Sequence, residues 1–128
     1  MNDNSGQDIL VVEDDLDLRE ALAELLEGRG FRVNTATNGA DALQRLQSMD
    51  APPDVILLDL MMPVMDGYGF LDARRLEPML ASIPVIVVTA AHALDRARLG
   101  ALTPVLPKPI QVPQLMTALR QFGAGGSA

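Results

Sequence analysis

The sequence lacks several residue types on which whole classes of protein depend. It has no cysteine, no tryptophan and one histidine among its 128 residues. The absence of cysteine excludes a disulfide framework and thiolate chemistry, and a single histidine excludes a zinc site built from several histidines. No apolar run reaches the roughly 18 residues that a membrane span needs. We therefore expect a soluble, cytoplasmic protein that does not enter a membrane.

Basic residues are also scarce. Ten lysine and arginine residues stand against 17 aspartate and glutamate residues, so the net charge is −7. A chain of this charge repels phosphate backbones, and direct binding of nucleic acid is not expected. All the basic residues except Lys108 are arginine, which makes that lysine unusual in this chain.

The residues that are present suit one globular domain. The length agrees with the roughly 100–200 residues of a typical domain, and 48% of the residues are hydrophobic. We interpret residues 1–7 as a flexible lead and residues 8–122 as the folded domain. Residues 123–128 are rich in glycine and are interpreted as a flexible tail.

Short apolar runs alternate with segments that carry apolar residues at helical spacing. The runs predict strands, and the spaced segments predict helices. The expected strands are 9–12, 31–36, 55–58, 85–88 and 105–106, and the expected helices are 16–26, 40–49, 68–80, 94–99 and 112–122. Strands that are apolar on both faces are typical of a parallel sheet covered by helices on both sides. The sequence therefore predicts an α/β fold with an open, doubly wound, five-stranded parallel sheet.

Polar residues follow the expected strands where each one ends. Glu13 and Asp14 follow the first run, Asp59 the third and Thr89 the fourth, and the last run leads to Lys108. Because the carboxyl ends of parallel strands lie along one edge, these side chains should meet there. Clustered carboxylates repel one another unless a cation joins them, and oxygen ligands without histidine or cysteine suit Mg²⁺. With a lysine and a hydroxyl beside it, such a cluster indicates an aspartate that accepts a phosphoryl group.

Each of these residues also has a purely structural interpretation. Acidic residues after a strand often cap the helix that follows, and we assign that role to Asp15 and Asp66. Thr89 taken alone is equally consistent with a cap. Asp59 differs because no helix start follows it directly, and a carboxylate that ends an apolar run is costly to bury without a partner.

Four stretches of the chain resemble the receiver domain of two-component response regulators. They are 11–15 (VVEDD), 57–67 (LLDLMMPVMDG), 87–90 (VVTA) and 107–109 (PKP), and they occur in the family's order. The resemblance covers residues 8–122 and implies the strand order 2-1-3-4-5. The stretch between Thr89 and Lys108 is short for this family, so we expect a shortened fourth helix.

The resemblance implies a role for each matching residue. Asp59 is similar to the family's phosphoacceptor. Glu13 and Asp14 are similar to the pair that holds Mg²⁺, with the backbone carbonyl of Met61 as a further ligand. A phosphohistidine on a sensor histidine kinase or a histidine phosphotransfer protein is the implied donor.

The remaining matches concern the phosphoryl group and the nearby loop. Thr89 resembles the family's switch hydroxyl, and Lys108 resembles the lysine that pairs with the phosphorylated aspartate. The bond from Lys108 to Pro109 is a candidate for a cis peptide. Pro63 and Gly67 resemble the residues that shape the loop after the phosphoacceptor.

Two features depart from the family's pattern. Val105 stands where the family usually has an aromatic residue to which the hydroxyl of Thr89 would couple, so we expect either a switch that is packed differently or a small output change. Met61 and Ala91 stand at the two positions that tune hydrolysis of the phosphoryl group. Neither side chain can orient a water molecule by hydrogen bonding, so we expect slow self-dephosphorylation.

The sequence thus predicts a phosphoacceptor receiver, either a single-domain regulator or a piece of a longer chain, that is not a turnover enzyme. A receiver-fold interaction module that works without phosphorylation is the main alternative. A hydrolase of the haloacid-dehalogenase type would need an acid where Met61 stands. A carrier of flavin mononucleotide is disfavoured because only four residues are aromatic.

Overall fold

The computed structural model describes residues 7–90, 92, 94–100 and 102–122, along which strands and helices alternate. The strands are β1 (Asp8–Val12), β2 (Arg32–Ala36), β3 (Val55–Asp59), β4 (Val85–Thr89) and β5 (Val105–Pro107). The helices are α1 (Leu16–Gly28), α2 (Gly39–Ser48), α3 (Gly67–Arg75), α4 (Pro78–Ala81), α5 (Arg96–Leu99) and α6 (Val112–Phe122). The expected tail, and the expected lead apart from its last residue, lie outside the described residues.

The strands form a five-stranded sheet in which each neighbouring pair is parallel. Their order is β2-β1-β3-β4-β5, which confirms the predicted fold and strand order. In the register of the sheet, Val12 lies beside Leu58, and Asp59 lies beside Val88. The residue that follows β1 therefore emerges next to the last residue of β3.

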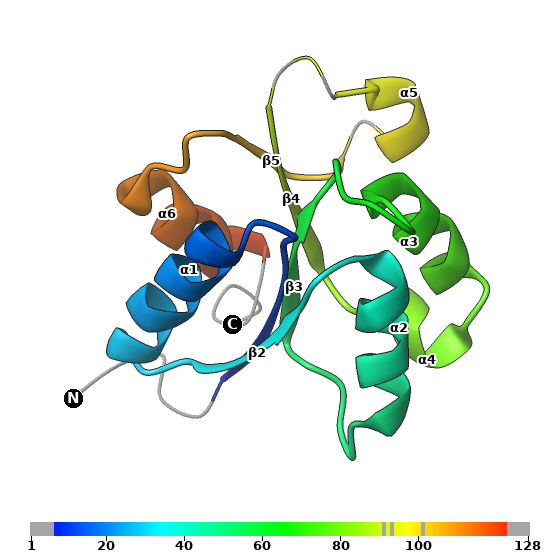
Figure 1. Ribbon diagram of the computed structural model, residues 1–128, viewed down its shortest axis with the longest axis horizontal. Helices are drawn as coiled ribbons and strands as arrows, with labels where there is room; N and C mark the ends of the chain where they lie inside the picture. The colour runs from blue at the N-terminus through cyan, green and yellow to red at the C-terminus, as the bar shows by residue number, and fades with distance from the viewer. Residues whose placement is uncertain (1–6, 91, 93, 101, 123–128) are drawn as a thin grey trace.

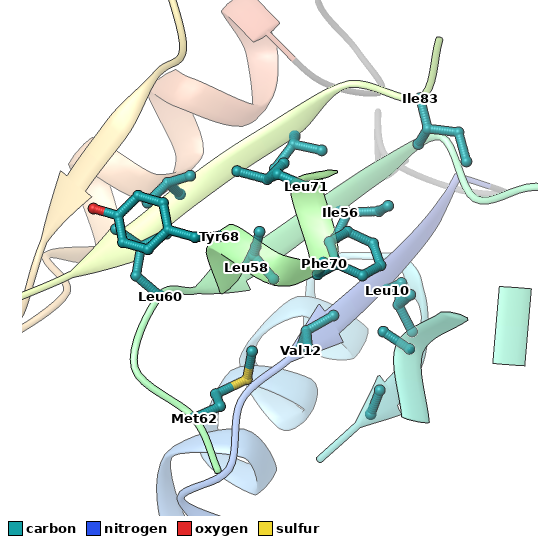
Figure 2. Close-up of a cluster of buried hydrophobic side chains, with 14 of the residues drawn as sticks. Leu10, Val12, Ile56, Leu58, Leu60, Met62, Tyr68, Phe70, Leu71 and Ile83 are labelled. Carbon is teal, nitrogen blue, oxygen red and sulfur yellow. The ribbon is translucent and has the colours of Figure 1, made fainter. Parts of the chain in front are cut away.

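Alternate residues of each strand point into two separate hydrophobic cores. Leu10 and Ile56 belong to the core shared with α2, α3, α4 and α5, whereas Ile9 and Leu57 belong to the core shared with α1 and α6. Figure 1 shows α1 and α6 on one side of the sheet and α2, α3 and α4 on the other. Figure 2 shows the first core, where Phe70 of α3 lies among side chains of β1 and β3. Because strand side chains alternate with a period of two, both faces of the apolar runs are used.

The single helix expected over residues 68–80 is wrong, because the chain forms two helices there. α3 ends at Arg75 and α4 begins at Pro78. Proline has no N–H to donate and disfavours helical backbone in the residue before it. Glu77 accordingly has extended backbone angles, with φ −108° and ψ 107°. The apolar spacing continues across the break, so periodicity alone did not reveal it.

The shortened helix expected near residues 94–99 is present as α5, a helix of four residues. Leu99 is its buried residue, and the other three residues of α5 are exposed. Gly100 follows with a φ of 90°, a backbone angle that glycine adopts more readily than other residues. In the described part of the chain, no helix combines the length and the apolar character that a membrane span requires.

Candidate functional site

Two carboxylates lie side by side inside the carboxyl edge of the sheet. Asp59 is the last residue of β3, and Glu13 directly follows β1, where its N–H donates to the Ala36 carbonyl at 3.0 Å. Glu13 is 3% exposed and Asp59 is 4% exposed. Burial of two neighbouring carboxylates is unfavourable unless they are paired with positive charge and hydrogen-bonded.

Lys108 supplies positive charge to both carboxylates. Its Nζ lies 2.9 Å from Oε1 of Glu13 and 3.3 Å from Oδ2 of Asp59. The main chain fixes this residue against β4, because the Lys108 N–H donates to the Thr89 carbonyl at 3.0 Å. The peptide bond from Lys108 to Pro109 is cis, the isomer that the sequence suggested. The structure thus brings together residues that are 95 positions apart in the chain.

The pKa of Glu13 shows that the ammonium of Lys108 does not fully compensate the negative charge of Glu13 and Asp59. Burial raises the pKa of Glu13 to about 7, although hydrogen bonds from Lys108 and from the Asp15 N–H act in the opposite direction. Burial also lowers the pKa of Lys108, but its hydrogen bond to Glu13 and the charges of Glu13 and Asp59 outweigh burial and raise that pKa overall. Further positive charge at this cluster would favour the ionised form of Glu13.

A third carboxylate completes an oxygen cluster that fits a metal ion. One carboxylate oxygen from each of Glu13, Asp14 and Asp59 lies within 4.8 Å of the others, and Asp14 is the exposed member. The set contains only oxygen donors, which suits a hard ion such as Mg²⁺. The Met61 N–H donates to Oδ1 of Asp59 at 3.3 Å, so Met61 adjoins the cluster through its backbone. Its carbonyl as a further ligand stays a prediction.

The two acidic residues assigned to helix caps stay outside the cluster, as predicted. Oδ1 of Asp15 accepts from the N–H groups of Asp17 and Leu18 at the start of α1. Oδ1 of Asp66 accepts from the Gly69 N–H at 2.9 Å at the start of α3. These hydrogen bonds satisfy orphan donors in the first turns of the helices.

Thr89 lies at the same edge of the sheet, but its hydroxyl is hydrogen-bonded to the next residue. It ends β4, is 2% exposed, and follows Val88, which is the register neighbour of Asp59. Its hydroxyl donates to the Ala90 carbonyl at 3.2 Å. Ala91, at the second expected hydrolysis-tuning position, lies outside the described residues. Val105 is partly buried against the core shared with α3.

The loop between β3 and α3 holds the strand and the helix in close contact. A Cβ added to Gly67 would lie 2.5 Å from the Asp59 carbonyl oxygen and 2.8 Å from the Leu60 Cα, so only glycine fits there. Within the loop, the Met65 N–H donates to the Pro63 carbonyl at 2.9 Å across Val64. Val64 has a φ of 72°, which sequence reasoning missed because valine carries no signal for such a conformation.

Comparisons with known proteins agree with this geometry. The family model of the response regulator receiver domain matches residues 9–120. A CpxR homolog of Haemophilus influenzae, a transcriptional regulatory protein, is 38% identical over 116 residues, which are 88% of this chain and 48% of the relative. The DNA-binding transcriptional regulator NtrC of Escherichia coli K12 is 37% identical over 118 residues, which are 88% of this chain and 24% of the relative. The chain therefore spans about half the length of the first relative and about a quarter of the second.

Solved structures show the same likeness in three dimensions. A putative response regulator from Chloroflexus aurantiacus superposes with a TM-score of 0.80 at 28% identity, covering 90% of this chain and 95% of the other. The receiver domain of a sensor histidine kinase from Pseudomonas aeruginosa also gives a TM-score of 0.80 at 28% identity, covering 92% of this chain and 98% of the other. That structure holds a magnesium ion coordinated in its active-site cleft.

Proposed function

Since the chain belongs to the response regulator receiver domain family, we propose that Asp59 accepts a phosphoryl group from a phosphohistidine and that the phosphorylated protein signals through a changed surface. The observation that carries this proposal is the environment of Asp59. Its carboxylate is buried, lies 3.3 Å from the ammonium of Lys108, and shares an oxygen cluster with Glu13 and Asp14.

The proposed transfer is a nucleophilic substitution at phosphorus. A carboxylate oxygen of Asp59 attacks the phosphorus atom, a P–O bond forms, and the P–N bond to the donor imidazole breaks. The nitrogen leaves with the electron pair of that bond and takes up a proton. Lys108 binds a phosphoryl oxygen from its place beside Asp59, and the buried Thr89 hydroxyl binds another after turning from the Ala90 carbonyl.

Magnesium fits the proposed site on the chemistry of its donors. Glu13, Asp14 and Asp59 would hold the ion, with the Met61 carbonyl as a further ligand. When bound, Mg²⁺ supplies positive charge that offsets the charge of the carboxylates and of the phosphoryl oxygens. The magnesium ion in the cleft of the Pseudomonas aeruginosa receiver domain supports this assignment.

We propose a sensor histidine kinase or a histidine phosphotransfer protein as the donor. A groove of about 340 Å³ opens beside Lys108, between α1 and the segment that joins β5 to α6. Its lining is mostly apolar and includes Leu18, Leu25 and Ile110. An apolar groove next to a charged site suits a protein donor, which can bury a helix there while its phosphohistidine reaches Asp59.

The same geometry supports a phosphoacceptor rather than a turnover enzyme. Met61 stands two residues after Asp59, and its thioether can neither donate a proton nor orient a water molecule. We therefore expect the phosphorylated protein to lose its phosphoryl group slowly. A half-life of seconds, measured by intact mass after removal of the phosphodonor, would contradict this expectation. Met61→Asn, which adds an amide beside the phosphoryl group, should shorten the half-life.

The direct test is intact mass after incubation with Mg²⁺ and phosphoramidate. The wild type should gain one phosphoryl adduct, and Asp59→Asn should gain none. Asp66→Asn is the matched control, because it removes the same charge from a nearby helix cap and an asparagine also caps a helix. It should be modified like the wild type. Absence of the adduct in the wild type would reject the proposal and favour an interaction module that works without phosphorylation.

A further inference from the structure

The first turn of α3 rests directly on the acceptor strand. The Gly67 N–H donates to the Leu60 carbonyl at 3.0 Å, and the space for a Cβ at Gly67 is filled by the backbone of Asp59 and Leu60. The backbones of the two segments are therefore in direct contact, and close-packed groups transmit a displacement of one to the other. A shift of the backbone at Asp59 would therefore displace the first turn of α3.

Tyr68, the next residue, connects this turn to α5. It is 7% exposed, and its ring belongs to the core cluster that also contains Leu99 of α5. Figure 2 shows its hydroxyl turned away from the other labelled side chains of that core. The hydroxyl accepts a hydrogen bond from the backbone N–H of Asp95, which is the N-cap of α5.

A charged side chain of α5 adds to the contact between α5 and α3. The guanidinium of Arg98 in α5 lies 4.3 Å from the centre of the Tyr68 ring, a cation–π arrangement. The same guanidinium lies 3.6 Å from the carboxylate of Asp72, four residues further along α3. Tyr68 and Asp72 thus hold the cap and the body of α5 against α3.

Beyond these contacts with α3, α5 is tied to the segment that precedes β5: the Arg96 guanidinium donates to the Thr103 carbonyl at 2.7 Å, and the Thr103 hydroxyl donates to the Leu99 carbonyl at 2.7 Å. α5 is a single helical turn with one buried residue, Leu99, and a helix this short is not stable on its own. Its place against α3 depends on the contacts with Tyr68 and Asp72, because the contacts with Thr103 join it only to the segment that follows. Short, exposed segments have low local stability, so α5 is a part of the fold that a displacement of Tyr68 could move.

We propose that Tyr68 is the residue through which phosphorylation of Asp59 changes the position of α5. The route runs from Asp59 to Gly67 by backbone contact, then to Tyr68, and from its ring and hydroxyl to Arg98 and Asp95. This inference rests on the proposed phosphorylation of Asp59. It assigns the response to an aromatic residue of α3 and makes α5 the part of the surface that responds.

The test uses the full chain labelled with ¹⁵N, Mg²⁺ and phosphoramidate. Intact mass reports the phosphorylated fraction, and the amide signals of Asp95 and Arg98 report the position of α5. Tyr68→Phe keeps the ring and removes only the hydroxyl, so it should fold and be phosphorylated like the wild type. In the wild type the signals of Asp95 and Arg98 should move on phosphorylation, and in Tyr68→Phe this movement should fall at least twofold. The movement of Val88 beside Asp59 should remain.

Each other outcome counts against the coupling. Equal movement of the α5 signals in Tyr68→Phe and in the wild type would show that α5 responds by another route. A phosphorylated wild type with unmoved Asp95 and Arg98 signals would show that α5 does not respond. Absence of the mass adduct would reject the phosphorylation of Asp59 together with this inference, and the mass measurement distinguishes that case from the other two.

Discussion

The acidic cluster and α5 lie at the same end of the sheet, yet they are held in opposite ways. Glu13 and Asp59 are almost fully buried, and Lys108 joins them across 95 positions of the chain. α5 is one exposed turn that contacts the core through Leu99, and its contacts with Tyr68, Asp72 and Thr103 are close in sequence or lie at the surface. In the proposed function, the strand ends hold the reacting groups in a fixed geometry, whereas the response takes place in a short, exposed segment of low local stability.

The largest expected effect comes from breaking the contact between the acceptor strand and α3. Gly67→Ala places a methyl group 2.5 Å from the Asp59 carbonyl oxygen, and we expect a loss of about 2–3 kcal/mol in the free energy of unfolding, as for overpacked sites. Gly28→Ala is the matched control, because nothing lies within 4 Å of its added Cβ. That variant should gain about 0.5 kcal/mol from helix propensity. Urea unfolding measures both, and equal effects would refute the close contact.

The second prediction separates the metal cluster from the adjacent helix cap. Asp14→Asn removes a carboxylate from the oxygen cluster, so we expect it to weaken Mg²⁺ binding about tenfold, or about 1.4 kcal/mol. Asp15→Asn removes the same charge one residue later but can still cap α1. Titration calorimetry with Mg²⁺ should show the larger loss for Asp14→Asn. Equal losses would mean that general charge, rather than coordination, attracts the ion.

The third prediction concerns stability at the cluster. Asp59→Asn leaves one buried carboxylate for the single ammonium of Lys108, because it removes the repulsion between Asp59 and Glu13. We expect the free energy of unfolding at neutral pH to rise by about 1 kcal/mol, as relief of an uncompensated buried charge suggests. Asp50→Asn, at an exposed position, should change it by less than about 0.5 kcal/mol. Destabilisation of Asp59→Asn in urea would show that the cluster is already well compensated.

The smallest expected effect lies in the loop that follows Asp59. Val64 has a φ of 72° and is 87% exposed, so burial of its side chain does not offset the strain of this backbone conformation. Asparagine tolerates this conformation better than a β-branched residue. Val64→Asn should therefore raise the free energy of unfolding by about 0.5–1 kcal/mol. Unchanged or lower stability in urea would indicate that Val64 makes a compensating contact.

The sequence was sufficient to predict the sheet and the residues that meet at its carboxyl edge, because both follow from the positions at which the apolar runs end. The run that stops before Glu13 and the run that ends in Asp59 predict which side chains share an edge, without any knowledge of distances. The break before Pro78 was missed because apolar spacing continues through it. The contact of Tyr68 with Asp95 could not be predicted, since a tyrosine within a helical pattern looks like any core residue and its partner is 27 positions away. Such contacts depend on how separate elements pack, which a local pattern does not contain.

Trapping of the acyl phosphate tests whether Asp59 carries the phosphoryl group. The protein is phosphorylated with phosphoramidate and Mg²⁺ and then treated with hydroxylamine, which converts an acyl phosphate into a hydroxamate and releases phosphate. Peptide mass spectrometry then locates the modified residue. The structure predicts a single hydroxamate at Asp59. A hydroxamate at another carboxylate, or none in protein that carries the mass adduct, would show that Asp59 is not the phosphoacceptor.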